Sequence, residues 1–506
     1  MRSKNYHHRC PTDKNNKTTT ETGPVFGLPV VKIVFADRQD KGTTTKNTKP
    51  TKQTKQTKPV KQSKPSKPAN LLKNRKDNNG WLTAEKFIIE PQEGRIRFHD
   101  FAIPDAIMHG IHDLSFQYCT PIQGAILKQT LKGQDATGKA QTGTGKSAAF
   151  LLQIMTNLLA KPLENRKKGT PRCLIIAPTR ELVIQIAEDA QDLAKYTDIT
   201  IVPVYGGMDY QKQEEAVRGN NLDIVVATPG RLLDFKRKQH IMLGQVEVFV
   251  IDEADRMLDM GFIPDVRQIV YSLPGKTKRQ TLFFSATMTP EVNMLAKQWT
   301  DNPAVVEIEP EKITVDTVKQ LVYLVTTEEK YHLLYNLIHT KDLHKVIVFC
   351  NMKSDTRKLT ELLKAHKIEC AMLSGDVDQK KRMTTLNNFK AGKIRVLIAT
   401  DVAGRGIHVE GVSHVVNFNL PYDPEDYVHR IGRTGRAGTT GTSISFACEE
   451  DAFYLPDIES FIEQKLDCVY PEESLLVEPP KVTVKKIPYK KNKRPQNRRN
   501  KPYRKK

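Results

Sequence analysis

Short apolar runs alternate with longer amphipathic stretches between about residues 95 and 308. The runs are rich in Val, Ile and Leu and end abruptly in polar turns that contain Gly or Pro. Strands that are apolar on both faces and alternate with helices indicate a parallel sheet covered on two sides. The strands predicted in this way are residues 173–177, 224–227, 248–251 and 281–284.

The same alternation begins again after a charged connector near residues 307–316. Its predicted strands are residues 346–349, 395–399, 415–418 and 442–446. The chain is therefore predicted to be α/β, with two lobes in tandem that are each built on a parallel sheet.

Composition divides the chain further. Residues 1–80 are rich in Lys, Thr and Pro and are predicted to be a disordered basic N-terminal tail. We expect residues 81–308 to form the first domain, 309–317 a linker and 318–479 the second domain. Residues 480–506 are expected to be a disordered basic C-terminal tail.

The formal net charge of +21 is concentrated in the two ends of the chain. Residues 1–80 carry 19 Lys and Arg against 5 Asp and Glu, and residues 481–506 carry 13 against none, so the body between them is mildly acidic. Basic tails attract polyanions by releasing counterions from a phosphate backbone, with little sequence preference. The alternative is that the tails only keep the protein in solution.

Within the first tail, a lysine falls at every third position from residue 46 to residue 67. Polyproline II has three residues per turn, so in that conformation these lysines would line one face. They would then form a cationic rail for a flexible phosphate chain. The alternative is low-complexity sequence without an ordered conformation.

The spacing of the cysteines and the length of the apolar runs indicate in which part of the cell the protein works. Seven cysteines are scattered without a Cys-x-x-Cys pair, which excludes a zinc ribbon and suits a reducing compartment. No apolar run approaches the ~18–20 residues of a membrane span. We therefore expect a cytoplasmic protein that does not bind a membrane. Residues 25–35 are apolar, but they are too short and too interrupted by Lys32 for a signal peptide, and their role does not follow from the sequence.

One segment has the composition of a phosphate-binding loop. Gly143 and Gly145 would let backbone N–H groups close around phosphate oxygens, and Lys146 would reach the β- and γ-phosphates. Ser147 offers a hydroxyl to Mg²⁺. Ala140 stands where the generic loop has Gly, and a chance Gly-rich turn is the alternative. The predicted ATP-binding segment is Ala140-Gln141-Thr142-Gly143-Thr144-Gly145-Lys146-Ser147.

Two acids follow the predicted strand 248–251. A phosphoryl-transfer site needs one acid to hold Mg²⁺ through water and another to polarise the attacking water. Asp252 suits the first role and Glu253 the second, so ATP and Mg²⁺ are the expected cofactors. An acidic helix cap is the alternative, and it fits Asp255 better than Glu253.

Three arginines fall within seven residues of the second lobe. Arg433 and Arg436 are three residues apart, so both guanidinium groups could reach one triphosphate and neutralise charge that develops on the transferring phosphoryl group. A nucleic-acid patch is the alternative, and it applies above all to Arg430.

Hydroxyl residues, Gly and Arg follow several predicted strands immediately. Ligands gather at the carboxyl ends of the strands of open parallel sheets, so these loops are expected to share one functional edge. Such residues suit contacts to phosphates, which position a nucleic acid without reading its bases. The loop residues are Pro178, Thr179, Arg180, Glu181, Thr228, Pro229, Gly230, Arg231, Ser285, Ala286, Thr287, Asn351, Thr400 and Asp401.

In this order, the motifs resemble those of the DEAD-box RNA helicases, whose name is spelled by Asp252-Glu253-Ala254-Asp255. The resemblance extends from about Phe98 to Glu450. It implies two tandem RecA-like P-loop domains flanked by the basic tails. It also implies that Gln123 binds the adenine edge while Phe98 stacks nearby. Further RNA contacts implied by it are Gly206, Gly207, Gln379 and Arg382, and the residues that couple hydrolysis to strand separation are Ser285, Ala286, Thr287, Asp401 and His429.

Within that family the chain is most similar to the bacterial helicases associated with the RNA-degradation machinery. This likeness implies a role in RNA degradation and an endoribonuclease of that machinery as a candidate partner. Gly404 stands where the family often has Ala, and His408 replaces the Asp expected to contact the ATP ribose.

The expected function is ATP-dependent unwinding of short RNA duplexes, with sequence-nonspecific binding of single-stranded RNA across both lobes. Two other functions remain open on the residues alone. One is a DNA helicase or translocase with the same lobes, since a 2′-hydroxyl contact cannot be identified from sequence. The other is an RNA-binding scaffold that uses hydrolysis only to reset itself.

Overall fold

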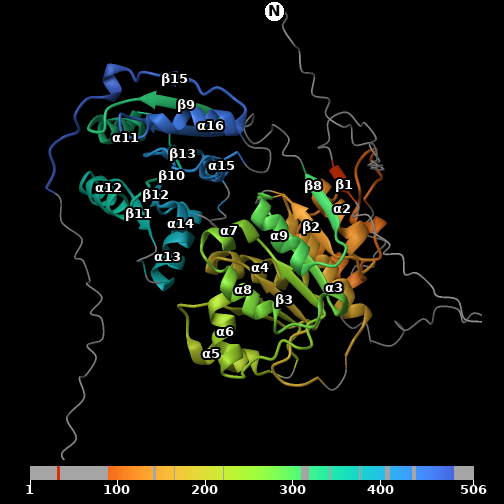
Figure 1. The fold of residues 1–506 in the computed structure, drawn as a ribbon. Helices are drawn as coiled ribbons and strands as arrows, with labels where there is room; N and C mark the ends of the chain where they lie inside the picture. The colour runs from red at the N-terminus through yellow and green to blue at the C-terminus, as the bar shows by residue number, and fades with distance from the viewer. Residues whose placement is uncertain are drawn as a thin grey trace, which may run out of the picture.

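The computed structural model describes residues 31–34, 89–140, 144–163, 166–219, 221–308, 318–340, 343–374, 377, 379–404, 409, 411–435 and 440–483. These residues form two α/β lobes that lie side by side (Figure 1). Lobe 1 ends at Ile308 and lobe 2 begins at Val318. The predicted linker 309–317 and most of both predicted tails lie outside the described residues.

Lobe 1 is built on a sheet of eight described strands, in which all pairs are parallel except that of β1 with β8. The strand order is β1 (Val31–Val34), β8 (Ala304–Ile308), β2 (Ala136–Lys139), β7 (Gln280–Ser285), β6 (Val248–Ile251), β3 (Cys173–Ile176), β5 (Ile224–Ala227) and β4 (Ile201–Val204). Its helices are α1 (Asp105–Asp113), α2 (Pro121–Thr130), α3 (Lys146–Ala160), α4 (Arg180–Leu193), α5 (Tyr210–Val217), α6 (Pro229–Arg237), α7 (Ala254–Asp259), α8 (Ile263–Val270) and α9 (Pro290–Trp299), with short turns η2 (Phe98–Asp100) and η3 (Lys276–Lys278).

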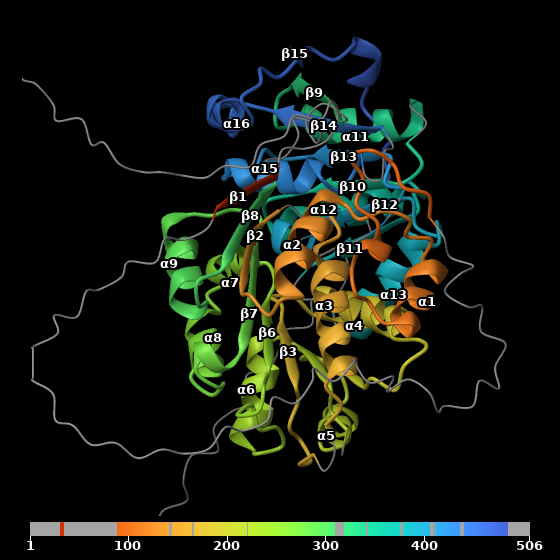
Figure 2. The same ribbon diagram turned by 90° about the vertical axis from the view of Figure 1, so that its right-hand side faces the viewer.

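Helices cover both faces of this sheet, with α2, α3 and α4 on one side and α8 and α9 on the other (Figure 2). The sequence explains this because successive residues of a strand point to opposite faces. Phe283 and Phe284 are adjacent in β7 and both are fully buried, yet they belong to the cores on different faces of the sheet. The prediction of strands that are apolar on both faces is confirmed here.

Lobe 2 repeats this architecture with a seven-stranded sheet whose described pairs are all parallel. The strand order is β11 (Cys370–Leu373), β12 (Val396–Ala399), β10 (Val346–Phe349), β13 (His414–Asn417), β14 (Gly441–Ala447), β9 (Val318–Leu324) and β15 (Cys468–Val469). Its helices are α11 (Glu329–Thr340), α12 (Lys353–Ala365), α13 (Gln379–Lys390), α14 (Asp401–Gly404), α15 (Pro424–Ile431) and α16 (Leu455–Ile462), with short turns η4 (Ala452–Tyr454) and η5 (Glu473–Leu475).

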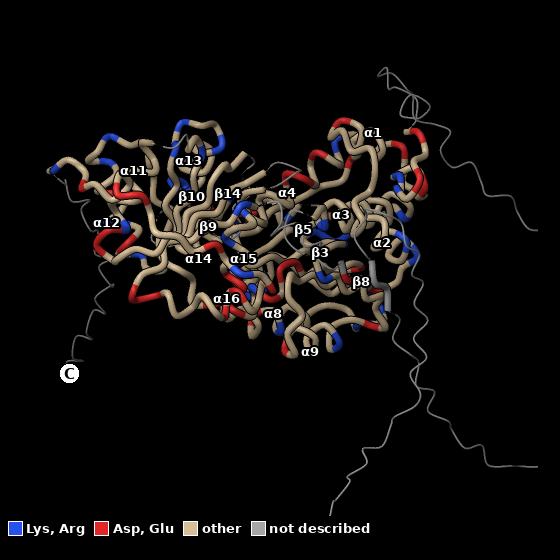
Figure 3. The backbone as a smooth tube through the Cα atoms, turned by 90° about the horizontal axis from the view of Figure 1, so that it is seen from above, with Lys and Arg blue, Asp and Glu red and all other residues tan. Residues whose placement is uncertain are grey.

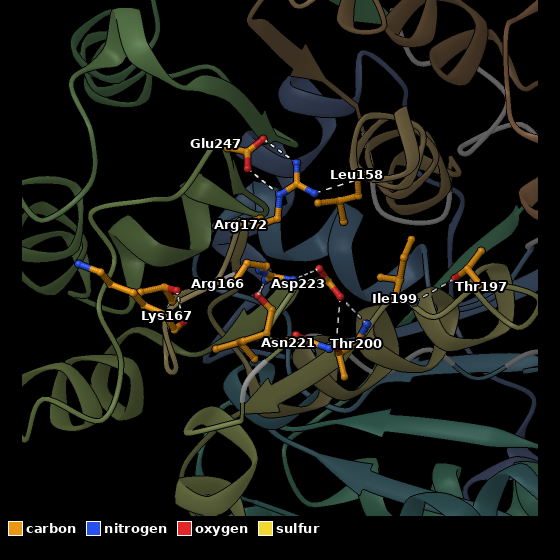
Figure 4. Close-up of polar contacts among 12 residues, drawn as sticks. Leu158, Arg166, Lys167, Arg172, Thr197, Ile199, Thr200, Asn221, Asp223 and Glu247 are labelled. Carbon is orange, nitrogen blue, oxygen red and sulfur yellow. Dashed lines mark hydrogen bonds and ion pairs between the residues drawn. The ribbon is translucent and has the colours of Figure 1, made fainter. Parts of the chain in front are cut away.

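A polar network ties together the amino ends of four strands of lobe 1 (Figure 4). Arg172 donates to both carboxylate oxygens of Glu247, at 2.6 and 2.9 Å, and its third nitrogen donates to the Leu158 carbonyl at the end of α3. Asp223 accepts from the Thr200 backbone N–H at 2.9 Å and pairs with Arg166 at 2.5 Å. This network stabilises the end of the sheet that lies opposite the functional loops.

The structure differs from the sequence-based expectation at Val31–Val34. This segment lies inside the predicted N-terminal tail, but it forms β1 and pairs antiparallel with β8. The register places Val31 opposite Ile308, the last residue of lobe 1. Within the described part of the chain, no helix combines the length and apolar character needed to cross a bilayer.

Candidate functional site: a nucleotide pocket beside an inter-lobe cleft

The predicted functional loops lie at the carboxyl ends of the parallel strands, as expected for this type of sheet. In lobe 1, β2 leads to Ala140, β3 to Pro178, β5 to Thr228 and β6 to Asp252, while β7 ends at Ser285. In lobe 2, β12 leads directly to Thr400. Figure 1 shows that α13 and α14 of lobe 2 lie on the side that faces lobe 1.

The described part of the phosphate-binding loop lies in close contact with Gln123, Ala140 and Asp252. Gly145 precedes α3 with φ of 87°, a left-handed conformation that favours glycine. A Cβ at this position would stand 2.5 Å from the Gln123 side chain. Lys146 is 5% exposed; its ammonium donates to the Ala140 carbonyl at 2.6 Å and lies 3.9 Å from Asp252. A buried cation held by a carbonyl fits an anionic ligand. Gln141, Thr142 and Gly143 lie outside the described residues.

The two residues expected near the adenine lie close to this loop but in different environments. Gln123 donates to the Gly145 carbonyl at 3.2 Å and accepts from the Thr120 backbone N–H at 2.8 Å, so it joins α2 to the loop. Phe98 is 1% exposed and belongs to the lobe 1 core. Its ring stacks on Phe116, which is 39% exposed and was not identified from the sequence.

The two acids after β6 are buried beside cations. Burial raises the pKa of Asp252 to about 6, with the nearby charge of Glu253 acting in the same direction and Lys146 opposing both. Burial also favours the neutral form of Glu253, but Arg256, Lys146 and Arg433 outweigh it and lower the pKa of Glu253 to about 2. Glu253 is therefore held as a carboxylate at neutral pH, the form that can accept a proton.

The backbone at Glu253 also has an unusual conformation. Its φ and ψ are both 54°, which is left-handed and rare for a residue with a side chain. Arg256 donates to the Glu253 carboxylate at 2.7 Å. A strained residue that is fixed by a buried ion pair fits a functional role better than a helix cap.

Asp255 links the acidic motif to the loop after β7. One of its carboxylate oxygens accepts from the backbone N–H groups of Ala286 and Thr287, at 3.0 and 2.9 Å, and its own N–H donates to the Ser285 hydroxyl at 3.2 Å. The residues predicted to couple hydrolysis to strand separation are thus joined to the Mg²⁺-binding candidate by one short motif. The sequence suggested Asp255 only as a helix cap.

A polar contact joins the two lobes through α4 and α13. Arg382 pairs with Glu181 at 2.5 Å, and Gln379 both donates to Glu181 at 3.1 Å and accepts from Arg180 at 3.2 Å. Arg382 also donates to the Ala403 carbonyl at 2.7 Å. Gln379 and Arg382 were predicted to contact RNA, whereas in this structure they contact lobe 1. Glu181 was predicted to lie with Arg180 on the functional edge, but its contact with lobe 2 was not predicted.

The two described arginines of the predicted finger motif have different environments. Arg430 is 1% exposed and pairs with Asp401 at 2.5 Å, while it also donates to Asn351 at 2.7 Å. The alternative that Arg430 belongs to an open nucleic-acid patch is therefore wrong. Arg433 donates to the His429 carbonyl at 3.0 Å and lines the inter-lobe cleft. Arg436 and His408 lie outside the described residues.

This cleft brings together parts of both lobes. Its lining includes Arg256 of lobe 1 and, from lobe 2, Phe349, Asp401, Gly404, Asp426, His429, Arg430 and Arg433. A Cβ at Gly404 would stand 2.4 Å from the Phe349 ring, which explains why glycine suits a position where the family often has Ala. Arg433 lines this cleft together with Arg256, which donates to Glu253 at 2.7 Å, so the predicted finger and the predicted base border the same space between the lobes.

The remaining predicted RNA contacts lie along the same edge of lobe 1. Thr179 caps α4, with its hydroxyl accepting from the Leu182 N–H at 3.3 Å, and Thr228 precedes α6. Gly230 has no heavy atom within 4 Å of where a Cβ would stand, so a ligand can approach its backbone. Gly206 and Gly207 form the turn between β4 and α5, beside the Arg180 guanidinium.

We expect Gly207→Ala to weaken RNA binding by about tenfold or more. Gly207 has φ of 83°, and an added Cβ would come into severe contact with the Arg180 guanidinium and stand 3.1 Å from Gln379. The left-handed conformation alone costs an L-residue about 1–2 kcal/mol. Titration of labelled single-stranded RNA measures the effect, and Gly133→Ala is the matched control, because Gly133 also has a left-handed φ of 85° but an added Cβ there would meet nothing within 4 Å. Equal losses in both variants would contradict a specific role for the Gly207–Arg180 contact.

Comparison with known proteins agrees with this geometry. Residues 120–295 match the DEAD/DEAH box helicase family and residues 329–438 match the helicase conserved C-terminal domain. The chain is 59% identical over 390 residues to the ATP-dependent RNA helicase RhlB of Pseudomonas aeruginosa, a match that covers 77% of this chain and 98% of that protein.

Two similar solved structures hold RNA and a nucleotide analogue. One is Dbp5 of S. cerevisiae bound to RNA and ADP BeF3, with a TM-score of 0.66 and 31% identity over 74% of this chain and 95% of that one. The other is Mss116p bound to single-stranded RNA and AMP-PNP, with a TM-score of 0.66 and 26% identity over 76% of this chain and 82% of that one. The arrangement of two RecA-like lobes, the motifs at their edges and these similarities together show that the chain belongs to the DEAD/DEAH box helicase family, among its RhlB-type ATP-dependent RNA helicases.

Proposed function

We propose that this ATP-dependent RNA helicase works by closing a nucleotide pocket whose two halves belong to different lobes. Lys146 of lobe 1 binds the phosphates, and Glu253 activates the attacking water. Arg433 and Arg436 of lobe 2 stabilise the charge that develops on the transferring phosphoryl group. The observation that carries this proposal is the cleft that Arg433 of lobe 2 shares with Arg256 of lobe 1, because Arg256 in turn donates to Glu253 at 2.7 Å.

Ser147 and Asp252 are the residues that would hold Mg²⁺ at this pocket. Ser147 lies in the first turn of α3, and Asp252 lies 3.9 Å from the Lys146 ammonium. A hydroxyl and a carboxylate are ligands that Mg²⁺ accepts, so the residues present fit the ion. When bound, Mg²⁺ neutralises charge on the phosphates.

Single-stranded RNA is proposed to bind along the loops at the carboxyl edges of both sheets. Thr179, Gly207, Thr228 and Arg231 supply contacts to its backbone in lobe 1, and Thr400 supplies them in lobe 2. Contacts of this kind position a strand without reading its sequence. Closure bends that strand, so a few base pairs open, and release of the cleaved nucleotide lets the lobes separate. Each base-pair step costs about 1–2 kcal/mol, which limits one cycle to a short duplex.

Acidic and basic positions are interspersed over both lobes (Figure 3), and the count along the sequence places the surplus of positive charge in the terminal segments. We propose that the basic segments 1–80 and 480–506 raise the local concentration of RNA by nonspecific attraction. We further propose that the protein lies in the cytoplasm, takes part in RNA degradation and binds an endoribonuclease.

The deciding experiment is ATP hydrolysis measured with and without nucleic acid. We expect single-stranded RNA to stimulate the wild-type rate while DNA of the same sequence does not, and Lys146→Ala to abolish both the basal and the stimulated rate because it removes the cation from the phosphates. Equal stimulation by DNA would favour a DNA translocase. Hydrolysis without strand separation of a short RNA duplex would favour the scaffold.

A further inference from the structure

Arg231 differs from several other arginines of the two lobes in how its charge is held. Arg256, Arg382 and Arg430 each pair with a carboxylate, at 2.7, 2.5 and 2.5 Å. No such pair is formed by Arg231 among the residues that the structure describes. Instead its guanidinium lies over the rings of Tyr210 and Phe235, 5.1 and 5.7 Å from their centroids.

One nitrogen of this guanidinium is also buried without a hydrogen-bond partner in the described part of the chain. A buried donor that lacks a partner costs free energy unless a ligand supplies one. Aromatic faces attract a guanidinium and fix its plane, yet they leave its charge uncompensated and its donors unused. The residue as a whole is only partly buried, so this environment orients a cation that an anion from outside the protein can reach.

Tyr210 is the residue that creates this environment from another element. It begins α5, three residues after Gly207, whereas Arg231 lies in the first turn of α6. The Tyr210 and Phe235 rings meet edge to face with centroids 5.0 Å apart, so the core fixes the tyrosine. Tyr210 also accepts a hydrogen bond from Lys238 at 3.0 Å, and the Lys238 ammonium lies 4.3 Å from its ring.

We propose that Tyr210 is a positioning residue for RNA binding, whose ring holds the Arg231 guanidinium ready for a backbone phosphate. The proposal rests on the proposed role of Arg231 in the RNA path. The contact between Tyr210 and Arg231 joins the loop after β4, which carries Gly206 and Gly207, to the loop after β5, which carries Thr228 and Gly230. The ligand is a phosphodiester, because the guanidinium donors match phosphate oxygens in charge and geometry.

The test is the dependence of ATP hydrolysis on the concentration of single-stranded RNA. We expect Tyr210→Leu and Arg231→Ala each to raise the KM for RNA by about 3- to 30-fold, the range expected for a partly desolvated cation–π contact. The kcat at saturating RNA should change less than twofold in Tyr210→Leu, because the nucleotide pocket is untouched. Tyr210→Phe should stay within twofold of wild type, since it keeps the ring and loses only the bond to Lys238.

The double variant separates positioning from an independent contact. If Tyr210 acts through Arg231, Tyr210→Leu adds no further increase in KM to Arg231→Ala. A full multiplicative increase, or an unchanged KM in Tyr210→Leu alone, would overturn the inference while leaving the proposed function intact. An unchanged KM in Arg231→Ala would instead remove Arg231 from the proposed RNA path.

Two further variants separate the ring contact from the packing and the hydroxyl of Tyr210. Tyr210→Met keeps apolar contact with Phe235, so it replaces Tyr210→Leu if that variant unfolds, and it is expected to raise the KM equally. Lys238→Ala should leave the KM within twofold of wild type. A KM in Lys238→Ala as high as that of Tyr210→Leu would show that the hydroxyl contact matters and the Arg231 contact does not.

Discussion

Glu253→Gln is expected to lower the rate of ATP hydrolysis by about 10²–10⁴-fold, the usual contribution of a general base. The amide keeps the size of the side chain but cannot accept a proton from the attacking water. Lys146 and Asp252 are unchanged, so the affinities for ATP and for RNA should remain near those of the wild type. Single-turnover hydrolysis and an equilibrium titration with labelled nucleotide measure the two effects separately.

The control for Glu253→Gln is Glu181→Gln, which changes a carboxylate in the inter-lobe contact but not in the nucleotide pocket. Its single-turnover hydrolysis at saturating RNA should fall far less than that of Glu253→Gln. If Glu253→Gln still unwinds a short duplex over many cycles, Glu253 is not the base and the proposed mechanism is incorrect.

Arg430→Ala is expected to lose stability and Arg433→Ala to lose ATP hydrolysis, although the two residues are only three positions apart. Removing Arg430 leaves Asp401 and Asn351 without their buried partner, and loss of one member of a buried ion pair destabilises a protein by about 3–5 kcal/mol. Removing Arg433 takes away a cation that faces the nucleotide pocket, so hydrolysis is lost while the fold is kept. Arginine fingers contribute about 10³–10⁵ in kcat.

Chemical denaturation of both variants, followed by a hydrolysis assay, distinguishes the two roles. Arg430→Lys serves as a second structural variant, because it keeps the charge but not the several donors that reach Asp401, Asn351 and the Asn419 carbonyl. A stable Arg430→Ala protein without ATPase activity would mean that Arg430 acts in the reaction. Full activity in Arg433→Ala would remove the split pocket from the mechanism.

Much of the fold could be predicted because buried parallel strands leave a strong local signal. The predicted strands 224–227, 248–251 and 346–349 have the observed bounds. The strand β2 was not predicted, because its sequence Ala-Thr-Gly-Lys is small and polar and its place is fixed by pairing with β7 and β8. β4 was also missed, since it contains a proline and lies at the edge of the sheet.

Contacts between residues that are far apart in the chain leave a weaker signal in the sequence than buried strands do. The sequence identified Arg180, Gln379 and Arg382, but it could not show that Glu181 joins two of them across the lobes. Nor could it separate Arg430 from Arg433, because identical side chains in one motif differ only in what surrounds them. The role of Tyr210 depends on a ring contact between two helices, which has no local pattern in the sequence.

The pairing of β1 with β8 bears on how this protein is best truncated. The outer edge of β8 carries backbone donors and acceptors that Val31–Val34 satisfies. A fragment that begins after residue 34 would uncover that edge next to Ile308, where lobe 1 ends. Open strand edges promote association between chains. A tendency of such a shortened enzyme to aggregate would therefore reflect the loss of one short strand, and it should not be mistaken for an instability of the catalytic lobes.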